Sequence, residues 1–132
     1  MGYEYLPDTS VDVAAALLET GTEDQASRAT LAAALHSSDQ DALLALLLRA
    51  AKSRSALTRG NAILGLGHLA RRFSSLDRIL VAPTLREALS DPDQYVRGHA
   101  TSAVEDARTF AGWAESDVRA DAQLSLGAGR GR

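Results

Sequence analysis

The stretch Thr58-Arg59-Gly60-Asn61-Ala62 is repeated 38 positions later as Val96-Arg97-Gly98-His99-Ala100. The same shift aligns Gly65-Leu66 with Ala103-Val104. Because Leu47 and Ala50 are also aligned with Leu85 and Ala88, each unit consists of one helix, a short turn and a second helix that carries an Arg-Gly pair near its start. Such a repeat is typical of α-solenoids, in which helical hairpins stack on their neighbours.

Helical periodicity extends outward from this repeat across most of the chain. Good helix formers fill long windows, and Thr22 with Gln25 forms a capping-box pattern, which Ser38 with Asp41 resembles more weakly. Pro83 falls inside one of the helical windows and should kink it or delay its start. The predicted helices cover residues 10–19, 23–36, 38–51, 56–73, 77–89 and 93–110. The sequence therefore predicts an all-α fold, a short right-handed α-solenoid of about three antiparallel helix pairs.

Length and composition indicate one domain. The chain has 132 residues, of which 45% are hydrophobic and 23% are charged, which is typical of a single globular core. We expect one helical domain over residues 1–113 and a weakly ordered C-terminal tail over residues 114–132, because residues 126–132 are rich in Gly and Arg.

Several classes of protein are disfavoured by composition. Without cysteine the chain can form no disulfide, no thiolate zinc site and no cysteine nucleophile. Its longest apolar run, residues 42–48, is too short to span a membrane, and the residues after Met1 do not form a signal peptide, so we expect a cytoplasmic protein. The net charge of −3 argues against nucleic acid as a partner. Lys52 is the single lysine beside many arginines, which suggests a bacterial coding bias.

One of the two units resembles a known repeat family. Asp91, followed by Val96-Arg97 and preceded by Pro83-Thr84-Leu85-Arg86-Glu87-Ala88-Leu89, resembles the Asp…Val-Arg signature of HEAT repeats. The resemblance covers residues 38–110 as two units, and residues 8–36 would form a divergent hairpin that caps the stack. In the first unit Arg59 is retained, whereas Ser53 replaces the Asp and Thr58 replaces the Val.

The HEAT resemblance implies structural roles for the signature residues. It implies that Asp91 caps its turn and that Arg97 spans neighbouring repeats, with Arg59 in the equivalent place one repeat earlier. We further expect Gly60 and Gly98 to allow equivalent close helix contacts in their two layers.

A second resemblance bears on function. The run from Arg59 to His68, together with Tyr95-Val96-Arg97-Gly98-His99-Ala100 and Phe110…Trp113, is similar to small HEAT-like immunity proteins encoded beside bacterial polymorphic toxins. This resemblance implies a non-enzymatic module that binds and neutralises a cognate toxin. A general HEAT-type adaptor is the alternative, and a HEAT-like nucleic-acid or ligand-modifying enzyme is a third. A DNA glycosylase needs a basic groove and aromatic residues that hold an extruded base, whereas this chain has a net negative charge and only six aromatic residues.

Four side chains invite a catalytic interpretation. Tyr95, His99, Ser102 and Asp106 lie on one flank of the last predicted helix. A Ser-His-Asp triad needs groups that converge from several elements and an oxyanion site, whereas neighbours on one helix point outward side by side. We therefore predict no catalytic residue.

A polar ribbon across two helices is the candidate binding site. The 38-residue shift aligns Asn61 with His99 and His68 with Asp106, so these four residues should lie side by side on adjacent helices. They either form inter-helix hydrogen bonds or, together with Tyr95, contribute to a face that binds a partner protein. Because only three histidines are present and no metal-ligand motif joins them, no metal or cofactor is expected. The acidic body would attract a basic partner such as a toxin domain.

Overall fold

The computed structural model describes residues 10–118, which are helical apart from short connections and contain no strand. This confirms the predicted all-α class. The six helices are α1 (Val11–Thr20), α2 (Glu23–His36), α3 (Gln40–Ala50), α4 (Ala56–Phe73), α5 (Arg78–Leu89) and α6 (Gln94–Ala111). A further helical turn begins at residues 116–118, where the described part of the chain ends.

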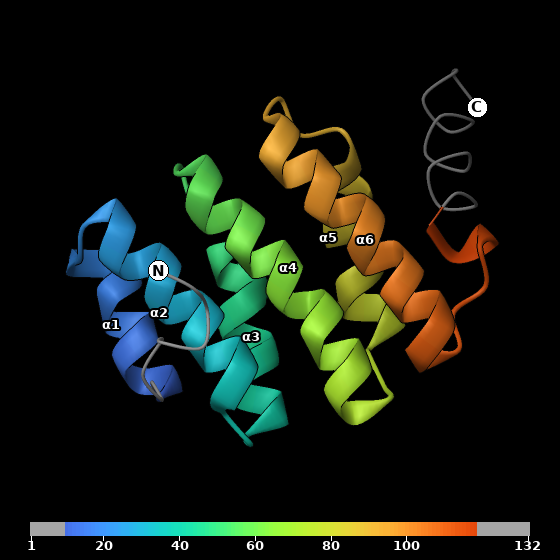
Figure 1. Cartoon of the computed structure of the whole chain (residues 1–132), viewed down its shortest axis with the longest axis horizontal. Helices are drawn as coiled ribbons and strands as arrows, with labels where there is room; N and C mark the ends of the chain where they lie inside the picture. The colour runs from blue at the N-terminus through green and yellow to red at the C-terminus, as the bar shows by residue number, and fades with distance from the viewer. Residues whose placement is uncertain (1–9, 119–132) are drawn as a thin grey trace.

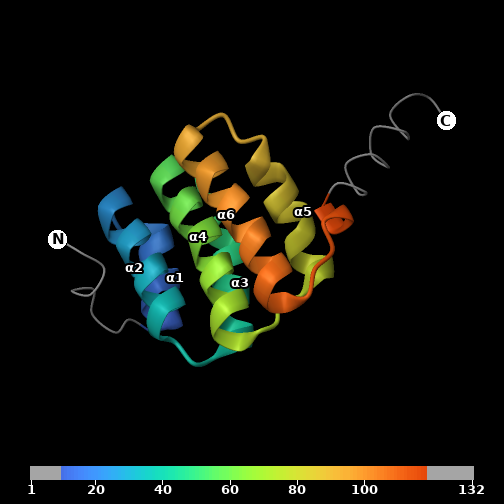
Figure 2. The same ribbon diagram turned by 45° about the vertical axis from the view of Figure 1, so that its right-hand side comes forward.

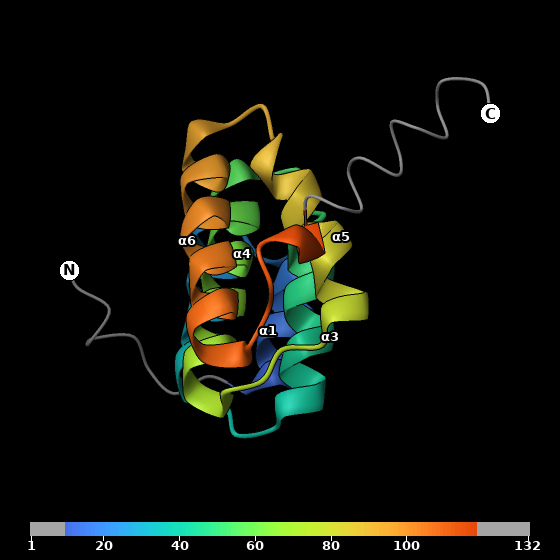
Figure 3. The same ribbon diagram turned by 90° about the vertical axis from the view of Figure 1, so that its right-hand side faces the viewer.

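The helices form three stacked hairpins, α1/α2, α3/α4 and α5/α6 (Figure 1). Helices α2, α4 and α6 lie side by side in one layer, and α1, α3 and α5 form the second layer behind them (Figures 2 and 3). The most extensive helix contact joins α4 to α6, and the next joins α2 to α4. The predicted short α-solenoid is therefore the observed architecture, with α4 as its central helix.

Local capping signals set the helix starts. Thr22 and Gln25 form the predicted capping box of α2, with both reciprocal hydrogen bonds present. The predicted role of Ser38 in the next helix is wrong, because Asp39 is the residue that caps α3 by accepting from Ala42 N at 3.1 Å. Helix α5 runs without interruption through Pro83, whose side chain is exposed.

The core extends past the domain boundary at residue 113 that the sequence suggested. Trp113 and Val118 are 7% and 5% exposed and belong to the main hydrophobic cluster. The Trp113 Nε1 donates to the carbonyl of Leu76 at 3.2 Å, which ties this segment to the connection between α4 and α5. Residues 114–118 thus belong to the folded body, and residues 119–132, the rest of the expected tail, lie outside the described residues.

Candidate functional site

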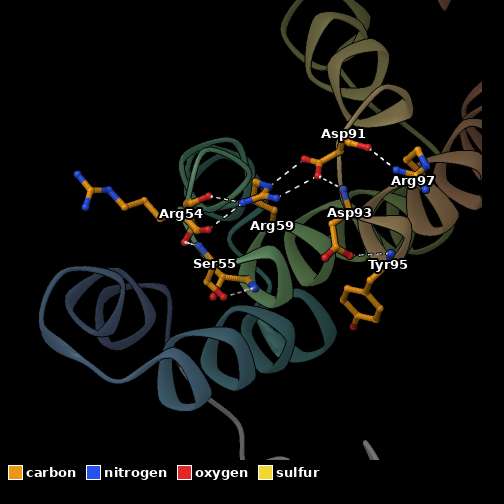
Figure 4. A network of polar contacts seen from close by, with 9 residues as sticks. Arg54, Ser55, Arg59, Asp91, Asp93, Tyr95 and Arg97 are labelled. Carbon is orange, nitrogen blue, oxygen red and sulfur yellow. Dashed lines mark hydrogen bonds and ion pairs between the residues drawn. The ribbon is translucent and has the colours of Figure 1, made fainter.

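Two successive hairpins are joined by an ion pair at the starts of α4 and α6. Arg59 donates through Nε and Nη2 to the two carboxylate oxygens of Asp91, at 2.9 and 3.0 Å (Figure 4). Its Nη1 donates to the carbonyls of Ser53 and Arg54, both at 3.0 Å. The Arg59 and Asp91 side chains are 19% and 11% exposed, so water screens this pair far less than an ordinary surface pair. The contact fixes the spacing of the two hairpins.

The contact between Arg59 and Asp91 shifts the pKa of both side chains. The hydrogen bonds from Arg59 lower the pKa of Asp91, against the opposing effect of burial. The same bonds raise the pKa of Arg59. Asp91 also accepts from the backbone N of Asp93 at 2.9 Å, which stabilises the turn before α6.

Arg97 does not have the role that the repeat signature implied. Its Nη1 donates to the backbone carbonyl of Asp91 at 2.7 Å, within its own hairpin. Among residues 10–118 it is Arg59, not Arg97, that pairs with an acid of another repeat, because Arg59 has a following hairpin against it. The expectation for Arg97 is therefore wrong in the described part of the chain.

Directly beside this ion pair, Tyr95 packs onto α4. A methyl group added at Gly60 would overlap the Tyr95 ring, so only glycine allows the ring to lie against the α4 backbone. The Tyr95 hydroxyl donates to Asn61 Oδ1 at 2.5 Å, and Asn61 Nδ2 donates to the carbonyl of Ser27 in α2 at 3.0 Å. Asn61 is 6% exposed, so its amide serves inter-helix hydrogen bonding and supports Tyr95 from below.

The remaining members of the predicted ribbon lie nearer the surface. The rings of His99 and Tyr95 meet edge to face, with centroids 4.6 Å apart. Asp106 pairs with Arg71 of α4 at 3.2 Å and lies over Gly67, where an added methyl would come within 2.7 Å of its Oδ2. Asp106 therefore does not orient His99, and the four candidate triad residues form no catalytic relay.

Burial affects the proton affinity of both histidines. The pKa of His99 is lowered by burial. The pKa of His68 is lowered by burial first and then by Arg71, with Asp106 acting in the opposite sense. Both imidazoles are therefore held toward the neutral form.

We define the α4/α6 face as the outward side of these two helices. It carries exposed or partly buried side chains at helical spacing, namely Leu57, Leu64, His68, Tyr95, His99, Ser102 and Asp106. Leu57 and Tyr95 are each 37% exposed. The structure thus brings four of the five predicted binding residues together at the surface, while Asn61 lies beneath them.

The repeated hairpins are similar in sequence to a known repeat family. A model of HEAT repeats matches residues 11–105. The chain belongs to the HEAT-repeat family. Searches of curated proteins and of solved structures gave no match. HEAT repeats generally mediate protein–protein interaction and are typically non-catalytic, so this HEAT protein fits a binding or scaffold role.

Sequence reasoning missed two features of this HEAT protein. Arg72 donates to the carbonyls of Ala34 and Ser37, both at 2.7 Å, and so ties α4 to the end of α2. Leu57 and Leu64 are apolar surface residues of the α4/α6 face, and their spacing of seven residues, the same as from Asn61 to His68, was the available signal.

The described residues offer no evident metal centre. Within residues 10–118 no three His, Asp or Glu side chains lie close enough together to hold a metal ion. In the same range, none of the helices has the length and apolar character needed to cross a membrane.

Proposed function

We propose that this HEAT protein binds another protein through the α4/α6 face. The observation that carries the proposal is the combination of apolar, aromatic and polar side chains on two helices that are held rigidly together. The Tyr95 side chain is held in one conformation by its contacts with Gly60 and Asn61. Binding a partner therefore costs little further side-chain entropy at this residue. Aromatic residues at the centre of a polar surrounding are typical of binding energy hot spots.

The partner class that we propose is a cognate bacterial toxin, which the chain would neutralise by covering its active site or substrate groove. Support comes from the resemblance to small HEAT-like immunity proteins. Further support comes from the net charge of −3, which would speed association with a basic toxin domain. A general HEAT-type adaptor is the alternative, since HEAT repeats generally mediate protein–protein interaction.

The test is co-expression with toxin domains encoded beside the gene, read out as cell growth and as complex formation by the purified proteins. We expect the natural chain to restore growth and to form a stable complex. Leu57→Arg and Ser102→Arg should abolish both, because they place charge and bulk on the α4/α6 face. The matched control is Ile79→Arg on α5, where the side chain is 81% exposed in the other layer.

Each outcome distinguishes the hypotheses. Neither complex nor protection with any neighbouring toxin would remove the immunity function. A complex that withstands both face substitutions and is lost in the α5 control would place the binding surface elsewhere. A partner without toxic activity, bound through the same face, would favour the adaptor.

A further inference from the structure

The contact between α4 and α6 is a three-point recognition of one hairpin by another. Arg59 holds the turn carboxylate of Asp91, Gly60 makes room for the Tyr95 ring, and Asn61 accepts from the Tyr95 hydroxyl. The three receptor residues are consecutive in α4. The two residues that they recognise are four positions apart, with Asp91 in the turn before α6 and Tyr95 in the first turn of that helix.

Helix α6 repeats this receptor on its outer flank. The 38-residue shift aligns Arg97, Gly98 and His99 with the three receptor residues of α4. Arg97 and Gly98 are exposed, and a methyl group added at Gly98 would have no neighbour within 4 Å.

The expectation that Gly98 allows the same close helix contact as Gly60 is wrong within residues 10–118, which give this glycine no packing role. A glycine inside a helix costs stability relative to alanine. At Gly60 this cost is offset by the close approach of Tyr95, whereas at Gly98 the described residues make no such approach. A residue that weakens the helix without serving its packing is consistent with close approach by a second molecule.

We propose that the outer flank of α6 is a docking site for a helical hairpin of a partner protein. Recognition continues the mode of the α4–α6 interface. An acidic residue in the partner's turn pairs with Arg97, and a tyrosine four positions later lays its ring on Gly98 and hydrogen-bonds His99.

The rest of the flank adds a charge requirement. Gly67, over which Asp106 lies, corresponds by the same shift to Glu105, which is exposed. The partner must therefore place a basic or neutral residue there, because an acid would face Glu105. Thr101 and Arg108 make the remaining flank polar, which suits reversible docking better than a permanent stack. Apart from His99 at its border, this flank is separate from the α4/α6 face, so the two proposals can fail independently.

A tandem chain supplies a defined probe. Inserting a second copy of residues 74–111 after Ala111 adds one repeat period and brings a second Asp91 and a second Tyr95 to the flank. The inserted copy carries Asp106→Lys, so that a basic side chain faces Glu105 of the first copy. The covalent link gives the docking hairpin a high effective concentration. We expect one cooperative urea transition with a larger m-value, because the added hairpin is stabilised only by docking.

Substitutions in the first copy identify the receptor. In the tandem chain Gly98→Ala and Gly98→Leu should each lower the ratio of native to unfolded molecules by at least tenfold. In the natural chain Gly98→Ala should raise this ratio, because the site is open and alanine favours the helix. If Gly98 had only a structural role, its substitution by alanine would change the stability of both chains in the same direction. Val13→Ala on α1, where the side chain is 51% exposed, is the matched control and should change the two chains equally.

Two results would overturn the proposal. One is a separate, low-stability transition of the inserted hairpin that does not respond to Arg97→Ala or to either Gly98 variant. The other is a natural partner that binds Gly98→Ala as tightly as it binds the natural chain. Tenfold weaker partner binding by the more stable Gly98→Ala chain would support the docking site.

Discussion

Arg59 and Asp91, 32 positions apart in the sequence, form a two-point ion pair that links the second hairpin to the third. The guanidinium also closes the turn before α4 by donating to two backbone carbonyls. One side chain therefore organises both its own turn and the neighbouring repeat.

Removing this pair should be costly. We expect Arg59→Ala to lower the free energy of unfolding by about 3 kcal/mol, because it leaves Asp91 charged and largely buried without its partner. Arg59→Lys should recover only part of the loss, since a single ammonium cannot bind both carboxylate oxygens in parallel. Urea denaturation of Arg59→Ala, Asp91→Ala and the double variant measures the coupling energy, and Arg59→Lys is measured beside them. If the losses in the free energy of unfolding of the two single variants add up to the loss of the double variant, Arg59 and Asp91 do not stabilise each other.

The pH dependence of the Asp91 contribution follows from its lowered pKa. Because the folded-state pKa lies below the ordinary value of 3.8, the stabilisation is complete above that value and is lost as the pH falls through the folded-state pKa. The difference in stability between the natural chain and Asp91→Asn should therefore stay constant near neutral pH and shrink only in strong acid. A difference that already shrinks near pH 6 would refute this assignment.

Gly60 and Gly98 form a matched pair of substitutions. Gly60→Ala should destabilise the chain by about 1.5 kcal/mol net, because displacing the Tyr95 ring outweighs the gain in helix propensity. Gly98→Ala should stabilise it by about 1 kcal/mol, because the added methyl group enters open space. Thermal or urea unfolding of both variants is the measurement. Equal effects at the two sites would mean that the repeats are packed alike.

Thr58 is a buried polar group without a hydrogen bond. Its side chain is 1% exposed, and within the described residues Oγ1 has no partner. Thr58→Val keeps the shape and removes the desolvation cost, so it should raise the free energy of unfolding by about 1 to 2 kcal/mol. Thr30→Val is the control, since the Thr30 hydroxyl donates to Ala26 O at 2.8 Å. An equal gain in the control would exclude this explanation.

His68 and His99 should make the chain less stable in mild acid. Burial is the first cause of the lowered pKa at both sites, so the unfolded chain takes up protons at a higher pH than the folded chain. Stability is therefore complete above the ordinary value of 6.5 and declines as the pH falls through the folded-state values. NMR titration of the two imidazoles gives these values, and His68→Gln with His99→Asn should flatten the decline between about pH 7 and about pH 5. Titration of both rings at or above 6.5 would contradict the prediction.

The helices were readable from the sequence because their signals are local. The bounds predicted for residues 23–36 and 56–73 are those observed, since caps such as Thr22 act on backbone groups two or three residues away. The 38-residue repeat likewise predicted that Asn61 and Tyr95 lie on neighbouring helices, which their hydrogen bond confirms. The resemblance of the Asp91 turn to HEAT repeats came from the same repeated pattern.

The tertiary structure alone decided which of two equivalent residues is used. Arg59 and Arg97, like Gly60 and Gly98, occupy the same place in the repeat, yet only the first of each pair meets another hairpin among the described residues. The sequence determined the repeating helical unit, because helix formation depends on near neighbours along the chain. It did not determine burial or pairing at each position, because these depend on which helix packs against that position, and this differs between the middle and the flank of the stack.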